Sequence, residues 1–258
     1  MCIIALAYKT PALGPLVLLA NRDEYYRRPA APLDYWQDAP QTLGGRDLQA
    51  GGSWLAIDTR GRLAAVTHIR DGRPQSPPAR SRGELVQRFV TGDEDALSYA
   101  QWLREHRHEF GPFNLLFGSY NDLLHFSSRS GQLNRLNPGI HVLSNAEMDT
   151  PWFKSERLRG HLQTLRRPPA EAEVLPWLCD RTAAEVAELP NTGVGLALEK
   201  LLSPVFIVGR DYGTRASSLL TVTARGDVGF AEVSWDMSGR ETGRRRYQFT
   251  VGIPRRSI

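Results

Sequence analysis

The sequence predicts an α+β protein in which two antiparallel β-sheets pack together and helices cover their outer faces. Segments with the apolar and β-branched content of strands dominate both ends of the 258-residue chain, whereas helical patterns gather in the middle. No internal repeat, heptad array or low-complexity tract divides the chain. We therefore expect one domain over residues 1–258, with a core of ordinary size.

The first two expected strands, residues 2–8 and 16–22, are apolar nearly throughout, as buried strands are. Pro11, Gly14 and Pro15 lie between these segments and mark a turn. The two strands are therefore expected to form a hairpin, which brings the end of the second strand back beside the start of the first.

The rest of the chain alternates between strands and helices. Residues 25–52 hold many Pro, Gly and Asp residues and are expected to form a long loop. Helices are expected at residues 83–90 and 93–109, from a cap at Asp149 to about residue 165, and in short pieces over 170–187. The remaining expected strands are residues 53–58, 62–68, 113–119, 123–128, 140–144, 204–209, 217–224, 228–235 and 245–251.

The composition argues against several classes of protein. Hydrophobic residues make up 41% and charged residues 23%, which is ordinary for a soluble globular protein. No apolar run approaches the roughly 20 residues that cross a bilayer, and no basic segment precedes the short run at residues 16–20, so neither a membrane span nor a secretory signal is expected.

Charge and cysteine content argue against a nucleic-acid-binding protein and against a disulfide-bonded secreted protein. The net charge is +4, the basic residues are scattered among acidic ones, and the one dense run, residues 244–246, is expected to be a solvated strand end rather than a nucleic-acid surface. Cys2 and Cys179 do not make a disulfide framework, which agrees with a reducing compartment. We expect a cytoplasmic protein, with Cys179 buried and inert.

Cys2 directly follows Met1, and this position offers a chemistry that an internal cysteine lacks. Removal of Met1, which the small side chain of cysteine permits, gives Cys2 a thiol and a free α-amine on one residue. That pair is a nucleophile with its own base, since an α-amine titrates near pH 8 and a thiol at about 8.5. The alternative is that Cys2 is only a small buried hydrophobe.

The stretch ANRDE ends the second expected strand, and the hairpin places Arg22 and Asp23 near Cys2. The positive charge of Arg22 favours the thiolate form of a neighbouring cysteine. The carboxylate of Asp23 can hold a protonated α-amine in place. The alternative is a structural ion-pair cluster of Arg22, Asp23 and Glu24 that holds the loop after it.

Several motifs together resemble the NRDE-motif family, also called the transport and Golgi organisation family. They are MC at the start, NRDE, GGSWLAID, FNLL and LSNAEMDTPWFKSERLR, and the likeness runs to about YGTRASSLL. The resemblance implies a four-layer αββα fold similar to the N-terminal-nucleophile hydrolases. It is closest to the branch with penicillin V acylase, bile-salt hydrolase and acyl-coenzyme A transferases. The family has also been tied to haem trafficking and lipid metabolism.

The same resemblance implies roles for five residues as a catalytic set. Cys2 matches the nucleophile, and Arg22 and Asp23 match an arginine and an aspartate on the second strand. Asn145, in VLSNAEMDTP, resembles an asparagine that polarises a carbonyl, and Arg215, in YGTR, resembles a late active-site arginine. Asn145 precedes an expected helix, so capping or a turn is the alternative role.

Asn21, Trp54 and His68 are assigned to substrate binding. Trp54 follows two glycines and either packs the core or lines the mouth of a pocket. His68 ends the strand LAAVTHIR, where the family tends to have asparagine. Histidine can still donate a hydrogen bond, but this departure puts in doubt an oxyanion site built from an aimed amide.

Two functions fit these residues. The first is a Cys2-dependent hydrolase or acyltransferase that acts on a small amide or acyl compound and needs no cofactor. The alternative is a non-catalytic protein that binds haem or an acyl lipid in the same cleft, with Cys2 and His68 as the candidate axial ligands of haem. No zinc spacing, CxxCH, Walker loop or GxGxxG before a helix is present in the sequence. The oligomeric state does not follow from the sequence.

Overall fold

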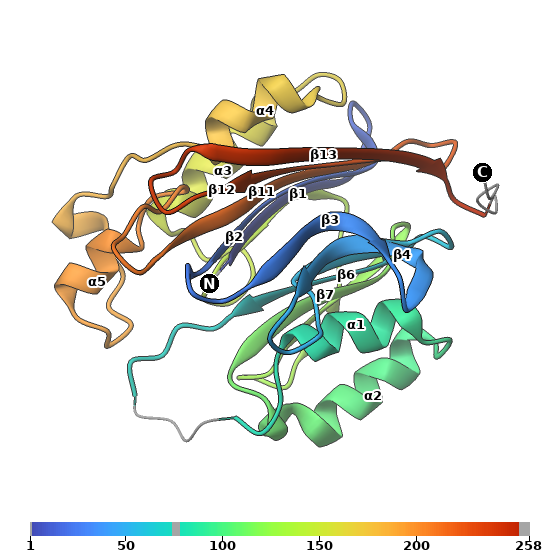
Figure 1. Cartoon of the computed structure of the whole chain (residues 1–258), viewed down its shortest axis with the longest axis horizontal. Coiled ribbons are helices and arrows are strands. Elements are labelled where there is room, and N and C mark those ends of the chain that lie inside the picture. The colour runs from blue at the N-terminus through green and yellow to red at the C-terminus, as the bar shows by residue number, and fades with distance from the viewer. Residues whose placement is uncertain (1, 74–77, 253–258) are drawn as a thin grey trace.

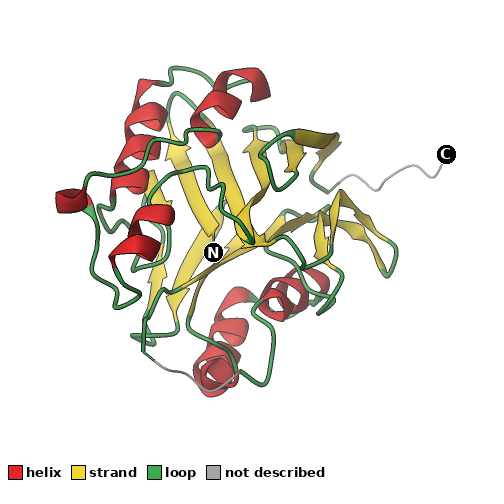
Figure 2. Ribbon diagram, turned by 60° about the vertical axis from the view of Figure 1, so that its left-hand side comes forward, coloured by secondary structure: helices red, strands yellow, loops and turns green. Residues whose placement is uncertain are grey.

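The computed structural model describes residues 2–73 and 78–252. Two antiparallel sheets face each other, and helices cover the outer face of each sheet (Figures 1 and 2). This arrangement confirms the expected four-layer αββα sandwich. The prediction that Met1 is removed concerns a residue outside the described ranges.

The first sheet has six strands in the described chain, in the order β10-β1-β2-β11-β12-β13. The strands are β1 (Cys2–Thr10), β2 (Gly14–Tyr25), β10 (Gly139–Leu143), β11 (Tyr212–Val222), β12 (Asp227–Trp235) and β13 (Glu241–Thr250). β1 and β2 form the expected hairpin, in a register that sets Cys2 opposite Arg22. Since β10 pairs with the other side of β1, the strand that starts with Cys2 is an internal strand.

The second sheet has seven described strands in chain order, from β3 to β9. They are β3 (Ala30–Trp36), β4 (Ala39–Asp47), β5 (Leu55–Asp58), β6 (Arg62–His68), β7 (Phe113–Ser119), β8 (Asp122–Ser127) and β9 (Leu133–Arg135). Each strand pairs with the next in an antiparallel meander, so the short connections predicted from the turn residues account for the topology.

The helices divide between the two outer faces (Figure 1). α1 (Gly83–Thr91) and α2 (Ala96–His106) pack on the second sheet, and η1 (Arg107–Glu109) follows α2. α3 (Phe153–Thr164) and α4 (Glu171–Leu178) pack on the first sheet, and η2 (Val186–Glu188) and α5 (Leu196–Leu201) follow them. No helix in the described part of the chain is long and apolar enough to cross a membrane.

The first two strands are apolar on both faces because both faces are covered. Leu6 and Leu18 point between the two sheets, where they belong to the central core. Ala5 and Val17 point the other way, into the layer that α3 and α4 cover. Full burial of each such leucine stabilises the fold by about 1.5–3 kcal/mol, so the hairpin that carries Cys2 is firmly fixed.

The prediction of a long loop at residues 25–52 is wrong, because β3 and β4 occupy most of it. Gly44 and Gly45 are strand positions that admit no side chain. A Cβ on Gly44 would lie 2.7 Å from the carbonyl oxygen of Leu55, and one on Gly45 would lie 2.1 Å from the ring of Trp54. These glycines let the neighbouring chain approach closely, which the sequence pattern alone does not distinguish from a turn.

Two smaller predictions are also wrong. Residues 204–209 form no strand, and Val208 makes only an isolated bridge with Gly213. Asp149 does not cap α3, whose N-cap residue is Trp152. The carboxylate of Asp149 instead accepts hydrogen bonds from the backbone N–H of Val142 (2.8 Å) and from the guanidinium of Arg159 (2.7 Å). β9 and α5 were not predicted, since both are short and carry weak patterns.

Candidate functional site

A cavity of about 350 Å³ opens where the start of β1 meets the end of β6 and the start of α1. Cys2, Arg22, Trp54, His68 and Arg82 are among its lining residues. The hairpin register places the first two side by side, and β6 delivers His68 from the opposite sheet. The cavity therefore gathers Cys2, Arg22, Asp23, Trp54 and His68 from the eight residues that sequence analysis selected.

Cys2 keeps partial solvent exposure, although its thiol lies among protein atoms. Burial raises the pKa of this thiol, and the negative charge of Asp23 adds to the rise. The charge of Arg22 and the backbone N–H of Asp23 act in the opposite direction without overcoming burial. Arg22 thus has the expected influence, but the net direction of the pKa is upward, and the thiol needs a base to lose its proton.

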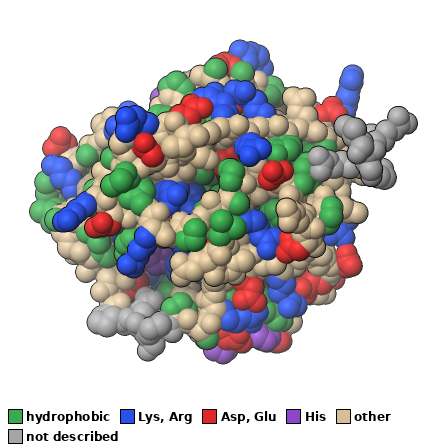
Figure 3. Space-filling view, in the orientation of Figure 1, with side chains coloured by type: hydrophobic (Ala, Val, Ile, Leu, Met, Phe, Trp, Pro, Cys, Tyr) green, Lys and Arg blue, Asp and Glu red, His purple; other side chains and the backbone are tan. Residues whose placement is uncertain are grey.

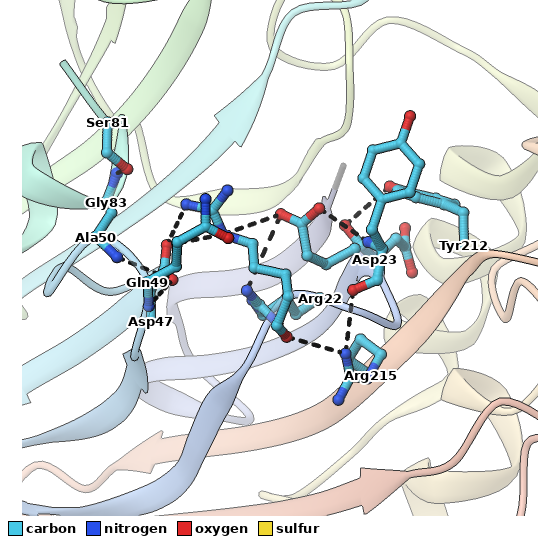
Figure 4. A network of polar contacts seen from close by, with 12 residues as sticks. Arg22, Asp23, Asp47, Gln49, Ala50, Ser81, Gly83, Tyr212 and Arg215 are labelled. Carbon is cyan, nitrogen blue, oxygen red and sulfur yellow. Dashed lines mark hydrogen bonds and ion pairs between the residues drawn. The ribbon is translucent and has the colours of Figure 1, made fainter.

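Arg22 is 5% exposed, and its guanidinium lies 4.3 Å from the ring centre of Trp54. The cation therefore packs on an aromatic face in a largely dry site. Its nearest carboxylate, Glu24, is 4.0 Å away, and Glu24 is equally far from Arg28 (Figure 4). The charged side chains of the NRDE motif therefore do lie near one another, but the ion pairs of Glu24 are long and lie on one side of the cavity.

Asp23 is buried beside β11 and α3. It accepts a hydrogen bond from the hydroxyl of Thr214 (2.7 Å), and its backbone carbonyl accepts one from Tyr212 (2.8 Å; Figure 4). Burial raises the pKa of its carboxyl, and the charge of Lys154 partly offsets this. Burial has the opposite effect on a basic group, and it lowers the pKa of Lys154 to about 8. A buried carboxyl and a buried amine thus stand next to Cys2, both with pKa values shifted toward the neutral range.

Asn145 is fully buried and joins the ends of two strands from different sheets. Its side-chain amide donates to the carbonyl oxygen of His68 (2.9 Å) and to that of Cys2 (3.4 Å). Its oxygen accepts from Lys154 (3.5 Å). Both amide donations go to backbone oxygens in this structure, so the polarisation of a substrate carbonyl by Asn145 stays a prediction.

His68 lines the cavity at the end of β6. Burial, followed by the positive charge of Arg82, lowers the pKa of its imidazole to about 3. The ring is therefore neutral at physiological pH and offers one N–H donor and one acceptor nitrogen. It supplies a neutral polar group at the end of β6, facing the cavity.

Three of the eight selected residues do not line this cavity. Asn145 contacts the backbone oxygens of two lining residues, and the other two are Asn21 and Arg215. Asn21 points to the helix-covered face, where its amide donates to the carbonyl oxygens of Leu178 and Val205, both at 2.8 Å. Arg215 lines a second cavity of about 320 Å³. Its Nη1 donates to the carbonyl oxygens of three residues at the end of β2 and in the connection to β3: Tyr25, Tyr26 and Arg28.

Trp54 lines both cavities, and together with Arg22 it separates them. The glycines before it explain the AGGSW motif. A Cβ on Gly52 would lie 2.2 Å from the carbonyl carbon of Gly83, and the N–H of Ser53 donates to the oxygen of Gly83 at 3.0 Å. The motif therefore presses the loop onto the start of α1 and fixes one wall of the first cavity.

Sequence analysis missed Lys154 and Arg82, which both act on the site electrostatically. Lys154 belongs to the quoted segment LSNAEMDTPWFKSERLR, but a lysine in the first turn of a helix normally lies at the surface. Within the described residues, no group of three or more His, Cys, Asp or Glu side chains could hold a metal ion.

The fold and site define a class of protein: an αββα sandwich with a cysteine at the start of an internal strand, beside a cavity. The chain belongs to the Transport and Golgi organisation 2 family, whose sequence model matches residues 1–237. A relative in Homo sapiens, Transport and Golgi organization protein 2 homolog, is 35% identical and covers 97% of this chain and 99% of its own. The mouse homolog is 34% identical over the same shares, and the Drosophila melanogaster protein is 25% identical over 90% of this chain and 91% of its own.

Solved structures with a similar chain path are much more distant in sequence. The C2A mutant of the conjugated bile acid hydrolase from Clostridium perfringens has a TM-score of 0.49 and 8% identity, with all of both chains covered. A Caenorhabditis elegans ortholog of N-acylethanolamine-hydrolyzing acid amidase has a TM-score of 0.39 and 12% identity, over 85% of this chain and 92% of its own. These likenesses concern the path of the chain and carry no argument about chemistry.

Proposed function

We propose that this protein is a cytoplasmic hydrolase or acyltransferase in which Cys2, freed of Met1, attacks a small amide or activated acyl compound. The observation that supports this most is the position of Cys2. It forms part of a cavity wall, at the start of a strand paired on both sides, beside the ionisable groups of Arg22, Asp23 and Lys154. Such a cluster is typical of a tuned nucleophile.

The raised pKa of the Cys2 thiol explains why a base is needed on the same residue. In the proposed reaction the α-amine of Cys2 takes the thiol proton, and the sulfur attacks the substrate carbonyl. The protonated amine then returns this proton to the leaving nitrogen, which leaves a thioester on Cys2. Water, or another acceptor, attacks the thioester and releases the acyl group. Asp23 stabilises the protonated amine in this scheme.

The developing negative charge on the carbonyl oxygen needs a hydrogen-bond donor. His68 is the better-placed candidate in this structure, since it lines the cavity as a neutral ring. Asn145 is proposed to hold Cys2 and His68 in position relative to each other, because its amide donates hydrogen bonds to the carbonyl oxygens of both residues.

The experiment combines intact mass with acylation by p-nitrophenyl butyrate. We expect the purified protein to lack Met1 and to gain one butyryl group on Cys2. Cys2→Ala should abolish the adduct and lower any turnover by about a thousandfold or more, whereas the matched Cys179→Ala variant should behave like the parent. A protein that retains Met1 in nearly all molecules, or a Cys2→Ala variant that still acylates, would contradict the proposal.

A non-catalytic carrier is the second candidate, because Cys2 and the neutral His68 line one cavity and both are groups that ligate haem iron. Titration with haem should then give a saturable Soret shift that Cys2→Ala and His68→Ala both change. Weak, non-saturating binding that ignores both substitutions would count against this candidate. An acyl-lipid cargo would instead compete with butyryl labelling of Cys2 without a spectral change.

A further inference from the structure

Most charges around the first cavity are compensated by a neighbour. Arg28 pairs with Asp47 at 2.5 Å. Arg80 pairs with Glu109 at 2.7 Å and also with Glu84. These two arginines therefore add little net charge to the cavity that they line.

Arg82 has fewer partners than the other lining arginines, since even Arg22 has Glu24 at 4.0 Å. Within residues 2–73 and 78–252, no hydrogen bond or ion pair reaches its guanidinium. The residue is nevertheless half-buried at the N-cap of α1 and lines the cavity. An arginine stays protonated in proteins, so this is a permanent charge partly removed from water, for which the described residues supply no carboxylate at ion-pair distance.

The position of the Arg82 side chain is also constrained. Gly111 has no side chain, and a Cβ there would lie 2.9 Å from Nη1 of Arg82. The guanidinium thus packs closely over backbone on one side. Burial lowers the pKa of Arg82, while the charges of Glu24 and of a Cys2 thiolate act in the opposite direction. Arg82 and Cys2 are therefore close enough to interact across the cavity.

We propose that Arg82 holds the carboxylate of a singly charged organic anion whose reactive carbonyl faces Cys2. A guanidinium binds a carboxylate through two parallel N–H···O bonds, which fixes orientation as well as charge. Glu24 also lines the cavity, with its nearest arginines 4.0 Å away, and its charge repels a doubly charged group such as a phosphate more strongly than a single carboxylate. The orientation of the substrate, with its carbonyl toward Cys2, rests on the proposed function. The substrate class that follows is acyl compounds that carry a carboxylate.

Two alkylating agents that differ in one charge test this without any turnover. Iodoacetate carries the carboxylate, iodoacetamide is its neutral counterpart, and Cys179 is an internal reference in the same molecule. We expect the ratio of the iodoacetate rate to the iodoacetamide rate to be at least about fivefold higher at Cys2 than at Cys179, as one partly screened charge pair gives. Peptide mass spectrometry measures both sites.

Variants assign the effect to Arg82. Arg82→Gln should remove the preference at Cys2, and Arg82→Lys should retain part of it. Gly111→Ala should weaken it by displacing the guanidinium while keeping its charge. Arg27→Gln removes an equal charge from an exposed residue in the β2–β3 connection and should change nothing. Equal rate ratios at the two cysteines, or a preference that survives Arg82→Gln, would overturn the proposal.

A second measurement separates the anion site from the nucleophile. Saturation-transfer NMR should show butyrate bound, butyramide bound more weakly, and butyrate binding lost in Arg82→Gln. Inorganic phosphate should displace butyrate only weakly in the same measurement. If Cys2 resists both alkylating agents, the proposed nucleophile fails, and the butyrate result alone decides the anion site. Binding of butyramide equal to that of butyrate, or no binding of either, would overturn it.

Discussion

The two cysteines of this chain differ less in burial than sequence analysis expected. Cys2 and Cys179 are both partly exposed, and burial raises the pKa of both thiols. Their neighbours differ instead. Cys179 caps the end of α4, where the charges that act on it, led by Arg181, are near the surface. Cys2 stands beside a cavity with buried ionisable groups around it. Burial therefore does not distinguish the proposed nucleophile from the other thiol, whereas the ionisable groups around each thiol do.

The largest effect that separates the two sites should come from Lys154, which has no counterpart at Cys179. Its pKa is lowered to about 8 in the folded protein and lies near 10.4 in an unfolded chain. Between these values the unfolded state holds a proton that the folded state does not, so the free energy of unfolding rises with pH. Lys154→Met should remove this rise, on the order of 3 kcal/mol, in urea unfolding measured from pH 7.5 to 10.

Lys200→Met is the control for Lys154→Met, because Lys200 is an exposed lysine in α5. The difference in unfolding free energy between this variant and the parent should be independent of pH. If the free energy of unfolding of the parent protein depended on pH in the same way as that of Lys154→Met, the Lys154 amine would not be desolvated. The charged groups near Cys2 would then be no more shielded from water than those near Cys179.

An intermediate effect is expected from Arg22. Since its charge favours the thiolate, Arg22→Ala should slow iodoacetamide labelling of Cys2 by about three- to tenfold near pH 7.5 and leave Cys179 unchanged. Arg22→Lys keeps the charge but not the planar contact with Trp54, so it should recover much of the rate. Near-UV circular dichroism confirms folding. An Arg22→Ala variant as reactive as the parent would leave the NRDE motif as a structural latch.

The smallest effect is expected at Cys179. Arg181 lowers the pKa of this thiol from an exposed position, where solvent and salt screen its charge. Arg181→Gln should therefore slow labelling of Cys179 by less than about twofold and leave Cys2 unaffected. A change at Cys179 as large as that of Arg22→Ala at Cys2 would remove the contrast between the two sites.

The sequence predicted correctly those parts of the fold that are determined by residues close together in the chain. Strands buried on both faces are apolar throughout, and the hairpin turn then places Cys2 against Arg22. The failures arise from contacts made later in the chain. Gly44 and Gly45 resemble loop glycines until Leu55 and Trp54 are packed against them.

The candidate site shows the same limit. Asn21 and Arg22 are adjacent in the NRDE motif, but alternation along a strand sends them to opposite faces of the sheet. The two-residue period of a strand is enough to predict this separation. Arg82 and Lys154 had no local signal, since the burial of each is decided by segments remote in sequence. Figure 3 shows the remaining Lys and Arg side chains scattered over one face among Asp and Glu side chains, as the composition indicated.

The pairing of β1 with β10 has a consequence for biosynthesis. Cys2 is among the first residues to leave the ribosome, but β10 begins only at Gly139. At about 5–20 residues per second, synthesis of the intervening chain takes on the order of ten seconds. During that interval, residues 4–8 of β1 lack the strand that pairs with one of their edges. The maturation step on which the proposed chemistry depends would then act on a chain whose N-terminal strand still lacks that partner.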